Sequence, residues 1–447
     1  MNNQEHLGEE SIVKLLIKYS IPAILSMVVT SMYNIADRVF IGAIPGVGPL
    51  AIAGLGVTMP VFVLILAFAM LIAMGGVTNI SIKLGEGKKY EAEKILGNVF
   101  TLSIIVSVLI TVIGLFFLDE ILIMFGASTD TLIYAKEYMS VILIGTIFNL
   151  MGFTLNNAIR SDGNPKMAAR TMITGCVINL ILDPIFIFGF GLGIRGAAIA
   201  TVISQAVLAV WIVNYFTKGQ SVLKLKCELF KLDISIVKKI MAIGAAPFAF
   251  ELASSLVLVL TNNALKSQGG DLAIGAMTAV TSIALMFLMP IFGINQGVQT
   301  IIGYNFGAKK YDRAKKALTL SIIVATVILI LGLILVELMP GAFVGIFSND
   351  ETLMKIAVDG VRIYLITLPL LGISVVGPVY FQSIGKAKHS MFLSLLRQCI
   401  LLIPLLIILP SKFGLMGVWL AQPAADIIAS IVIFVFLKME FKKENII

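Results

Sequence analysis

The chain of 447 residues contains few charged side chains, only three cysteines and only two histidines. Charged residues make up 13% of it, whereas 59% of the residues are hydrophobic and the mean hydropathy is +1.02. Three widely spaced cysteines provide no disulfide framework, and His6 and His389 alone cannot form a metal cluster. A water-soluble domain could not bury so much apolar surface, so the composition indicates a membrane protein.

Long apolar runs are the main feature of the chain. A helix needs about 20 apolar residues to cross a bilayer, and the charge-free runs of this length are 95–118, 138–159, 196–217, 317–336 and 363–385. Two longer runs cover 39–82 and 272–308. A proline and two glycines near the start of the first run end one helix, and a single long helix follows. With the shorter runs that single acids interrupt, the sequence predicts twelve spanning helices.

The distribution of basic residues predicts the orientation, because Lys and Arg accumulate in short cytoplasmic loops. With the N-terminus in the cytoplasm, 26 of the 33 basic residues fall in inner segments, Arg160 and Arg397 among them. Both termini are then cytoplasmic, and the first helix is too long to be a cleaved signal peptide. The net charge of +8 indicates contact with anionic lipid and not with nucleic acid. We expect a multi-pass protein of a bacterial or archaeal inner membrane.

An internal repeat organises the chain, with corresponding positions 221 to 225 residues apart. The matching landmarks are Ser-Ile-Val-Lys at 11–14 and 235–238, Pro22 and Pro247, Lys-Lys-Tyr at 88–90 and 309–311, Phe125 and Phe347, and Ser-x-Gly-x-x-Lys at 161–166 and 383–388. The repeat predicts an all-α fold with two six-helix halves of like orientation, related by pseudo-two-fold symmetry. Their expected bounds are 1–217 and 236–447, joined by a cytoplasmic linker at 218–235. Parallel repeats are typical of secondary transporters.

Two carboxylates, Asp37 and Asp183, lie in otherwise uncharged apolar stretches, where an ionisable group is costly and usually functional. Asn179 and Asp183 are four residues apart and so share one face of a helix. Pro184 removes a backbone donor and frees a carbonyl in that turn. Together with Asp37 and Thr201, these residues predict a cluster of hard oxygens that suits Na⁺ or holds a proton.

Several motifs, taken together, resemble the multidrug and toxic compound extrusion (MATE) family over nearly the whole chain. They are Pro22, Tyr33-x-x-x-Asp37, the segment 155–165 with its Asn-Asn pair, Asn179-x-x-x-Asp183-Pro184, and the small residues at 196–201. In detail the chain is similar to the MepA-like and DinF-like bacterial branches. The resemblance implies the fold of the wider superfamily and an antiporter that exports organic cations and amphipathic drugs by alternating access. No cofactor is implied beyond the coupling ion, Na⁺ or H⁺.

The same resemblance implies roles for particular residues. It assigns ion binding to Asp37, Asn179, Asp183 and Thr201, places Tyr33 and Asn156 or Asn157 nearby, and makes Pro22 a hinge. Structural alternatives stay open at this point. Asp37 could pair with Arg38, Asp183 could be a hydrogen-bond hub, the two asparagines could cap their helix, and Pro22 could be a tolerated kink.

The C-terminal half carries two further acids in apolar stretches, Glu251 and Asp426. In the NorM-like branch of the same family, the cation site combines a glutamate in the seventh helix with an aspartate in the middle of the tenth helix. Here Asp359 lies near the outer end of that helix beside Arg362, so this site is not expected. Glu251 could line the drug cavity or carry a proton, and Asp426 could add negative charge that attracts cations, with methionines supplying adaptable apolar walls. For each acid, a structural polar contact is the alternative that stays open.

The main rival interpretation is a flippase of lipid-linked oligosaccharides from the same superfamily. Such a flippase would need extra spans and several basic residues in its cavity, whereas this chain has buried acids. The segment 191–196 matches the Gly-x-Gly-x-x-Gly motif of dinucleotide-binding proteins, but no predicted strand precedes it as that motif requires. The sequence also shows no nucleophile–base pair of a catalytic site. We therefore expect no enzyme. The expected partners are small-molecule drugs and membrane lipids, and the expected state is a monomer.

Overall fold

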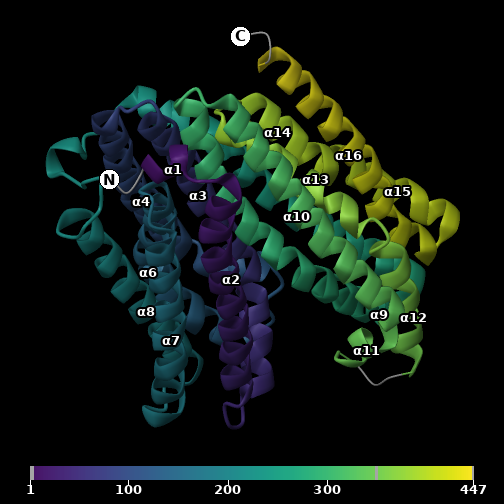
Figure 1. The fold of residues 1–447 in the computed structure, drawn as a ribbon. Helices are drawn as coiled ribbons and strands as arrows, with labels where there is room; N and C mark the ends of the chain where they lie inside the picture. The colour runs from purple at the N-terminus through teal and green to yellow at the C-terminus, as the bar shows by residue number, and fades with distance from the viewer. Residues whose placement is uncertain (1–4, 348–350, 445–447) are drawn as a thin grey trace. The chain divides into compact units, whose positions relative to one another are not determined.

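The computed structural model describes residues 5–347 and 351–444, and over these residues it is built from helices without a strand (Figure 1). The helices of the first part of the chain are α1 (Glu5–Glu9), α2 (Ile12–Gly42), α3 (Gly48–Gly85), α4 (Lys89–Phe116), α5 (Leu118–Met124), α6 (Thr129–Ser161), α7 (Pro165–Pro184), the π-helix η1 (Ile185–Gly189), α8 (Gly193–Thr217) and the 3₁₀-helix η2 (Cys227–Leu229).

The remaining helices are α9 (Ile234–Gly307), α10 (Tyr311–Leu338), α11 (Pro340–Gly345), α12 (Glu351–Tyr364), the 3₁₀-helix η3 (Leu368–Leu370), α13 (Leu371–Ser383), α14 (Ala387–Leu395), the π-helix η4 (Leu396–Leu401), α15 (Leu402–Phe413) and α16 (Leu415–Glu444). A sharp kink divides α9 at Gly270, whose φ is 64°.

The helix count agrees with the prediction. Within the described residues, eleven helices are long and apolar enough to cross a membrane. A pair bent by 46°, formed by Glu351–Tyr364 and Leu368–Ser383, makes a twelfth span if it is counted as one. The long helix expected after the proline-glycine break is α3, with 38 residues.

The contacts between helices divide the described chain into two compact units. Unit 1 contains 5–10 and 25–244, and unit 2 contains 11–24, 245–347 and 351–444. The division therefore passes through α2 after Ile24 and through α9 after Gly244. Both points lie within three residues of a repeat proline, Pro22 in α2 and Pro247 in α9.

Glycines allow the divided helices to pack closely within each unit. In unit 1, α6 packs against α3, α4, α7 and α8. The first turns of α9 also cross α3, so closely that a Cβ on Gly244 would overlap the backbone carbonyl of Leu71 and one on Gly75 would overlap that of Ile240. Small residues are what lets membrane helices approach to this distance.

Unit 2 repeats this crossing with the first turns of α2. A Cβ on Gly293 would lie 2.9 Å from the backbone N of Ile24, and one on Gly297 would lie 3.1 Å from the carbonyl carbon of Tyr19. Gly75 and Gly297 are 222 residues apart (297 minus 75), which is the spacing of the sequence repeat. The repeat is thus expressed in the packing of the helices as well as in their order.

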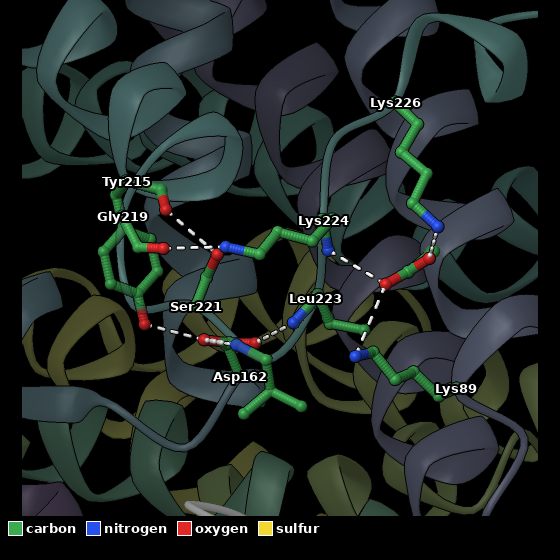
Figure 2. A network of polar contacts seen from close by, with 10 residues as sticks. Lys89, Asp162, Tyr215, Gly219, Ser221, Leu223, Lys224 and Lys226 are labelled. Carbon is green, nitrogen blue, oxygen red and sulfur yellow. Dashed lines mark hydrogen bonds and ion pairs between the residues drawn. The ribbon is translucent and has the colours of Figure 1, made fainter.

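The segment between α8 and α9 folds back onto unit 1 through a buried carboxylate, Asp162 (Figure 2). Asp162 Oδ2 accepts hydrogen bonds from the Tyr215 hydroxyl at 2.6 Å and from the Val222 backbone N at 3.2 Å, while Oδ1 accepts one from the Leu223 backbone N at 2.7 Å. Burial raises the pKa of Asp162 to about 6, although these hydrogen bonds and nearby Lys224 oppose the shift.

A second buried acid, Glu93 near the start of α4, holds the next part of this segment. Its carboxylate lies 2.9 Å from Lys226 Nζ and 3.8 Å from Lys89 Nζ, and it accepts a hydrogen bond from the Lys224 backbone N at 3.2 Å (Figure 2). The segment that the sequence predicts to be a linker is therefore a docked structure, held mainly through its backbone N–H groups.

The helix crossing in unit 1 can be tested with Gly244→Ala. The added Cβ meets a backbone carbonyl, which cannot move without displacing α3, so we expect a loss of stability of about 1–3 kcal/mol. Gly56→Ala in α3 is the matched control, since a Cβ there has no atom within 4 Å. Melting temperatures of the purified proteins in detergent give the comparison. Equal values for the two variants would contradict the proposed role of the crossing.

The stability that Asp162 contributes should depend on pH. Its folded-state pKa of about 6 exceeds the ordinary value of about 4, so between these pH values the folded protein binds a proton that the unfolded chain has lost. The free energy of unfolding should therefore fall as pH rises through this window, by about 3 kcal/mol at most. The difference in melting temperature between wild type and Asp162→Asn should shrink from pH 4.5 to pH 6.5. A constant difference would contradict the assignment.

Candidate functional site

The predicted cluster of oxygen ligands forms inside unit 1, between α7 and α8. Asp183 is completely buried in α7, and Asn179 and Thr201 are also buried. Asn179 Nδ2 donates hydrogen bonds to Asp183 Oδ1 at 3.3 Å and to Thr201 Oγ1 at 3.2 Å. The spacing of four residues thus places both α7 side chains on one face, as the sequence predicts, and Asn179 links them to α8.

Local sequence explains why the cluster forms at this point. The π-helix η1 follows Pro184 directly, and π turns of this kind are frequent at functional sites. The start of α8 packs against this turn through Gly196, where a Cβ would lie 2.7 Å from the carbonyl of Phe186. The close contact brings the next turn of α8, with Thr201, to the level of Asn179.

Asp37 joins this cluster from α2. It is 8% exposed, and its charge interacts with that of Asp183. Among the residues that the structure describes, no ion pair within 4 Å joins Arg38 to Asp37, although the charges of the two side chains interact. The hydroxyl of Tyr33, one turn earlier on α2, interacts electrostatically with both carboxylates.

Three oxygens of this cluster have unused hydrogen-bonding capacity. Asp37 Oδ1, Asn179 Oδ1 and Asp183 Oδ2 are buried and accept no hydrogen bond from any residue that the structure describes. Buried polar atoms are normally paired, and exceptions often mark the place of an ion or a water. Carboxylate, amide and hydroxyl oxygens are the ligand types that hard cations prefer. The arrangement is thus suited to a small cation or to protons.

Two further residues contribute to this region and were not predicted from the sequence. Tyr138 on α6 is buried, and its hydroxyl interacts with Thr201 and with the charges of Asp37 and Asp183. The Oγ1 of Thr30 on α2 lies 3.7 Å from the Sγ of Cys176 on α7. A buried tyrosine in a spanning helix usually finds a hydrogen-bond partner for its hydroxyl. The position of Tyr138 within an apolar run could therefore have indicated a polar contact there.

Asn156 and Asn157 do not lie beside the cluster, which corrects the expectation from the family resemblance. Asn156 Nδ2 donates to Ala168 O and Thr171 Oγ1, each at 2.8 Å, and so ties the end of α6 to the start of α7. Thr171 precedes Asp183 by twelve residues, or about 18 Å along a helix. Asn157 Oδ1 instead accepts a hydrogen bond from Arg160 Nη1 at 2.7 Å, and both are buried.

In unit 2 the two expected acids have different surroundings. Glu251 is half-buried in α9, four residues after Pro247, and makes no hydrogen bond or ion pair with any described residue. Asp426 in α16 is 1% exposed and fully partnered. Its Oδ1 accepts hydrogen bonds from Arg397 Nη1 at 3.2 Å and Gln422 Nε2 at 3.0 Å, and its Oδ2 accepts one from Thr367 Oγ1 at 3.2 Å.

These contacts correct two expectations from the sequence. Arg397 does not belong to a cytoplasmic loop, because it lies in η4, within the spanning stretch Ala387–Phe413. Asp426 does not offer a free negative charge, because the guanidinium of Arg397 balances it. Of the two acids, Glu251 alone remains available to attract a cation.

Comparison with known proteins agrees with the repeat. A model of the MatE family matches 22–185 and 247–408, and the two matched segments begin at the two repeat prolines. The multidrug export protein MepA of Staphylococcus haemolyticus (strain JCSC1435) is 28% identical over 431 residues, covering 96% of this chain and 94% of that protein.

Two solved structures share the fold over the full length. The outward-facing conformation of a multidrug resistance MATE family transporter of the MOP superfamily gives a TM-score of 0.93 at 24% identity, covering 100% of this chain and 99% of the other. A MOP superfamily transporter from Pyrococcus furiosus, for which the reverse polarity of the binding pocket suggests a different function, gives 0.92 at 25% identity, covering 99% and 98%.

Proposed function

Because this chain belongs to the MatE family of membrane transporters, we propose that it exports drugs of varied structure in exchange for Na⁺ or H⁺. The observation that carries the proposal is the set of unpartnered buried oxygens at Asp37, Asn179 and Asp183. Similarity to the multidrug export protein MepA over nearly the whole chain supports drugs as the cargo.

In this proposal, the cluster in unit 1 is the coupling site. Two carboxylates in an apolar interior repel one another, and a bound cation or proton removes that repulsion. Asp183 and Asn179 supply oxygens from one face of α7, Thr201 supplies a hydroxyl from α8, and Asp37 supplies the second negative charge. The free energy of the cluster would then differ with and without the bound ion. This difference would couple the ion gradient to the switch between inward-open and outward-open conformations.

Cargo recognition is assigned to a separate acid in unit 2. Glu251 has no partner among the described residues, so its carboxylate can attract an organic cation. We propose that units 1 and 2 act by alternating access and that Pro22, close to the point where the division passes through α2, serves as a hinge. The protein would function as a monomer in a bacterial or archaeal inner membrane, with both termini in the cytoplasm.

Coupling can be tested with Asp37→Asn and Asp183→Asn in proteoliposomes. Each change removes one charge from the cluster while keeping the side-chain shape, so we expect gradient-driven export of a cationic drug to fall at least tenfold. Na⁺ and pH gradients are imposed separately, which identifies the coupling ion. The exposed Glu120 on α5 supplies a matched control, and Glu120→Gln should export at the wild-type rate.

Melting temperatures of these variants separate loss of coupling from loss of folding. Both aspartate variants should melt close to the wild type, because removing one of two repelling charges does not weaken the fold. Gradient-driven export at the wild-type rate by Asp183→Asn would refute the assignment of the coupling site.

The role of Glu251 can be tested by comparing one cationic and one neutral substrate. Glu251→Gln removes the charge that attracts the cation, so we expect the apparent affinity for the cation to fall about tenfold, or about 1.4 kcal/mol, with little change for the neutral compound. Binding is measured by fluorescence titration of both proteins. Equal loss for the two substrates would instead indicate a role in coupling or folding.

A further inference from the structure

Unit 2 contains a cavity that is separate from the ion cluster of unit 1. Its volume is about 370 Å³, and its walls come from α9, α12, η4, α15 and α16. A smaller space of about 150 Å³ adjoins it and is lined by Arg397 and Asp426. The lining residues that the two spaces share are Ala284, Leu288, Tyr364, Gln398 and Gln422. Small-molecule sites are commonly cavities of 300–1,000 Å³ with mostly apolar walls and a few polar groups.

The polar end of this cavity has spare donors and no spare acid. Asp426 already accepts three hydrogen bonds, as described above. A guanidinium carries five N–H donors, whereas Arg397 makes a single side-chain hydrogen bond to the residues that the structure describes, through Nη1. Its side chain is 15% exposed and lines the smaller space together with Asp426. The pair carries no net charge, and the hydrogen-bonding capacity left unused at this end is that of a donor.

The first half of the repeat has the opposite polarity at the equivalent place. The 225-residue spacing that relates Pro22 to Pro247 also relates Asp37 to Asn262, which lines the larger space. The spanning stretch 387–413, which follows the repeated Ser-x-Gly-x-x-Lys motif as α7 does, contains no acid. At these equivalent places, the first half therefore presents carboxylate oxygens that need a cation, and the second presents spare arginine donors that can bind an anion.

Packing alone does not account for this arrangement. A buried ion pair adds little net stability compared with apolar side chains of similar size, and packing would not require a cavity beside it. Arg397 and Gln398 both lie on the π-helix η4, just as the acid cluster lies beside the π-helix η1. A carboxylate is the group that a planar guanidinium binds with the best geometry, through two parallel hydrogen bonds.

We propose that this cavity is a binding site for an amphipathic carboxylate, whose anionic group is held by Arg397 and whose apolar body fills the larger space. Gln398 and Gln422 are placed to hydrogen-bond the polar end, and residues such as Leu258 and Leu406 surround the apolar part. Export of such a carboxylate would depend on the proposed function, whereas its binding does not. Binding itself is tested without transport.

The test measures binding of three naphthalene probes to the purified full-length protein by calorimetry. The probes are 2-naphthylacetate, its amide and the corresponding ethylammonium, which share one apolar body and differ in charge. For the wild type we expect the carboxylate to bind about tenfold more tightly than either of the others, a typical gain for a charge-assisted hydrogen bond. Equal affinity for the three probes would overturn the proposal.

Two variants then locate the site. Arg397→Gln combined with Asp426→Asn removes both charges together and leaves no lone buried charge, so the preference for the carboxylate should disappear. Ala284→Phe fills the junction of the two spaces and should weaken all three probes at least tenfold, whereas Met286→Phe, two residues away and 51% exposed, should not. Unchanged binding of 2-naphthylacetate to Ala284→Phe would refute the site.

A parallel measurement separates this inference from the proposed function. Export of a cationic drug by the wild type in proteoliposomes tests antiport alone and does not involve Arg397. If that export fails while 2-naphthylacetate binding depends on Arg397 and Ala284, the antiporter proposal is wrong and the site stands. If export succeeds while 2-naphthylacetate binding does not depend on Arg397 or Ala284, the proposed site is wrong and the antiporter proposal stands.

Discussion

A carboxylate inside a membrane must find its partners within the protein, and this requirement orders the polar interior of the chain. Asp162, at the end of α6, accepts three hydrogen bonds, and Asp426 accepts three, one of them from an arginine. Asp183 accepts one hydrogen bond, from Asn179, and Asp37, whose charge interacts with that of Asp183, has an unpartnered oxygen. The fully partnered acids stabilise the fold, and the under-partnered pair depends on a positive charge from outside it.

The repeat supplies the backbone on which these acids are placed. Each unit accepts the first turns of a helix whose remainder belongs to the other unit, and in each case glycines in α3 or α9 remove the side chains that would prevent the crossing. Gly75 and Gly297 occupy equivalent positions of the repeat. At both positions a side chain would meet the backbone of the crossing helix, which favours glycine at both. The polar residues are under no such steric restriction, and so the two halves differ in charge while they agree in shape.

Much of this could be predicted from the sequence, because run length and spacing are local properties. The spans, the long α3, the repeat and the shared face of Asn179 and Asp183 all follow from them. The position of Arg397 could not be predicted in this way, since an arginine is ordinarily a loop signal and its partner Asp426 is 29 residues away on another helix. Tyr138 and the true partners of Asn156 were likewise missed, because their contacts cross between helices.

Opposite polarity in two halves of one fold has a consequence for a transporter of varied compounds. A single acidic cavity would favour cations and reject carboxylates, since an unpaired negative charge repels them. Here two under-partnered acids lie in unit 1, whereas unit 2 has an arginine with spare donors beside a cavity of about 370 Å³. In each proposed site, apolar surroundings would strengthen the interaction with a ligand of opposite charge. If both proposed sites bind ligands, a broad range of cargo follows from two sites of different chemistry.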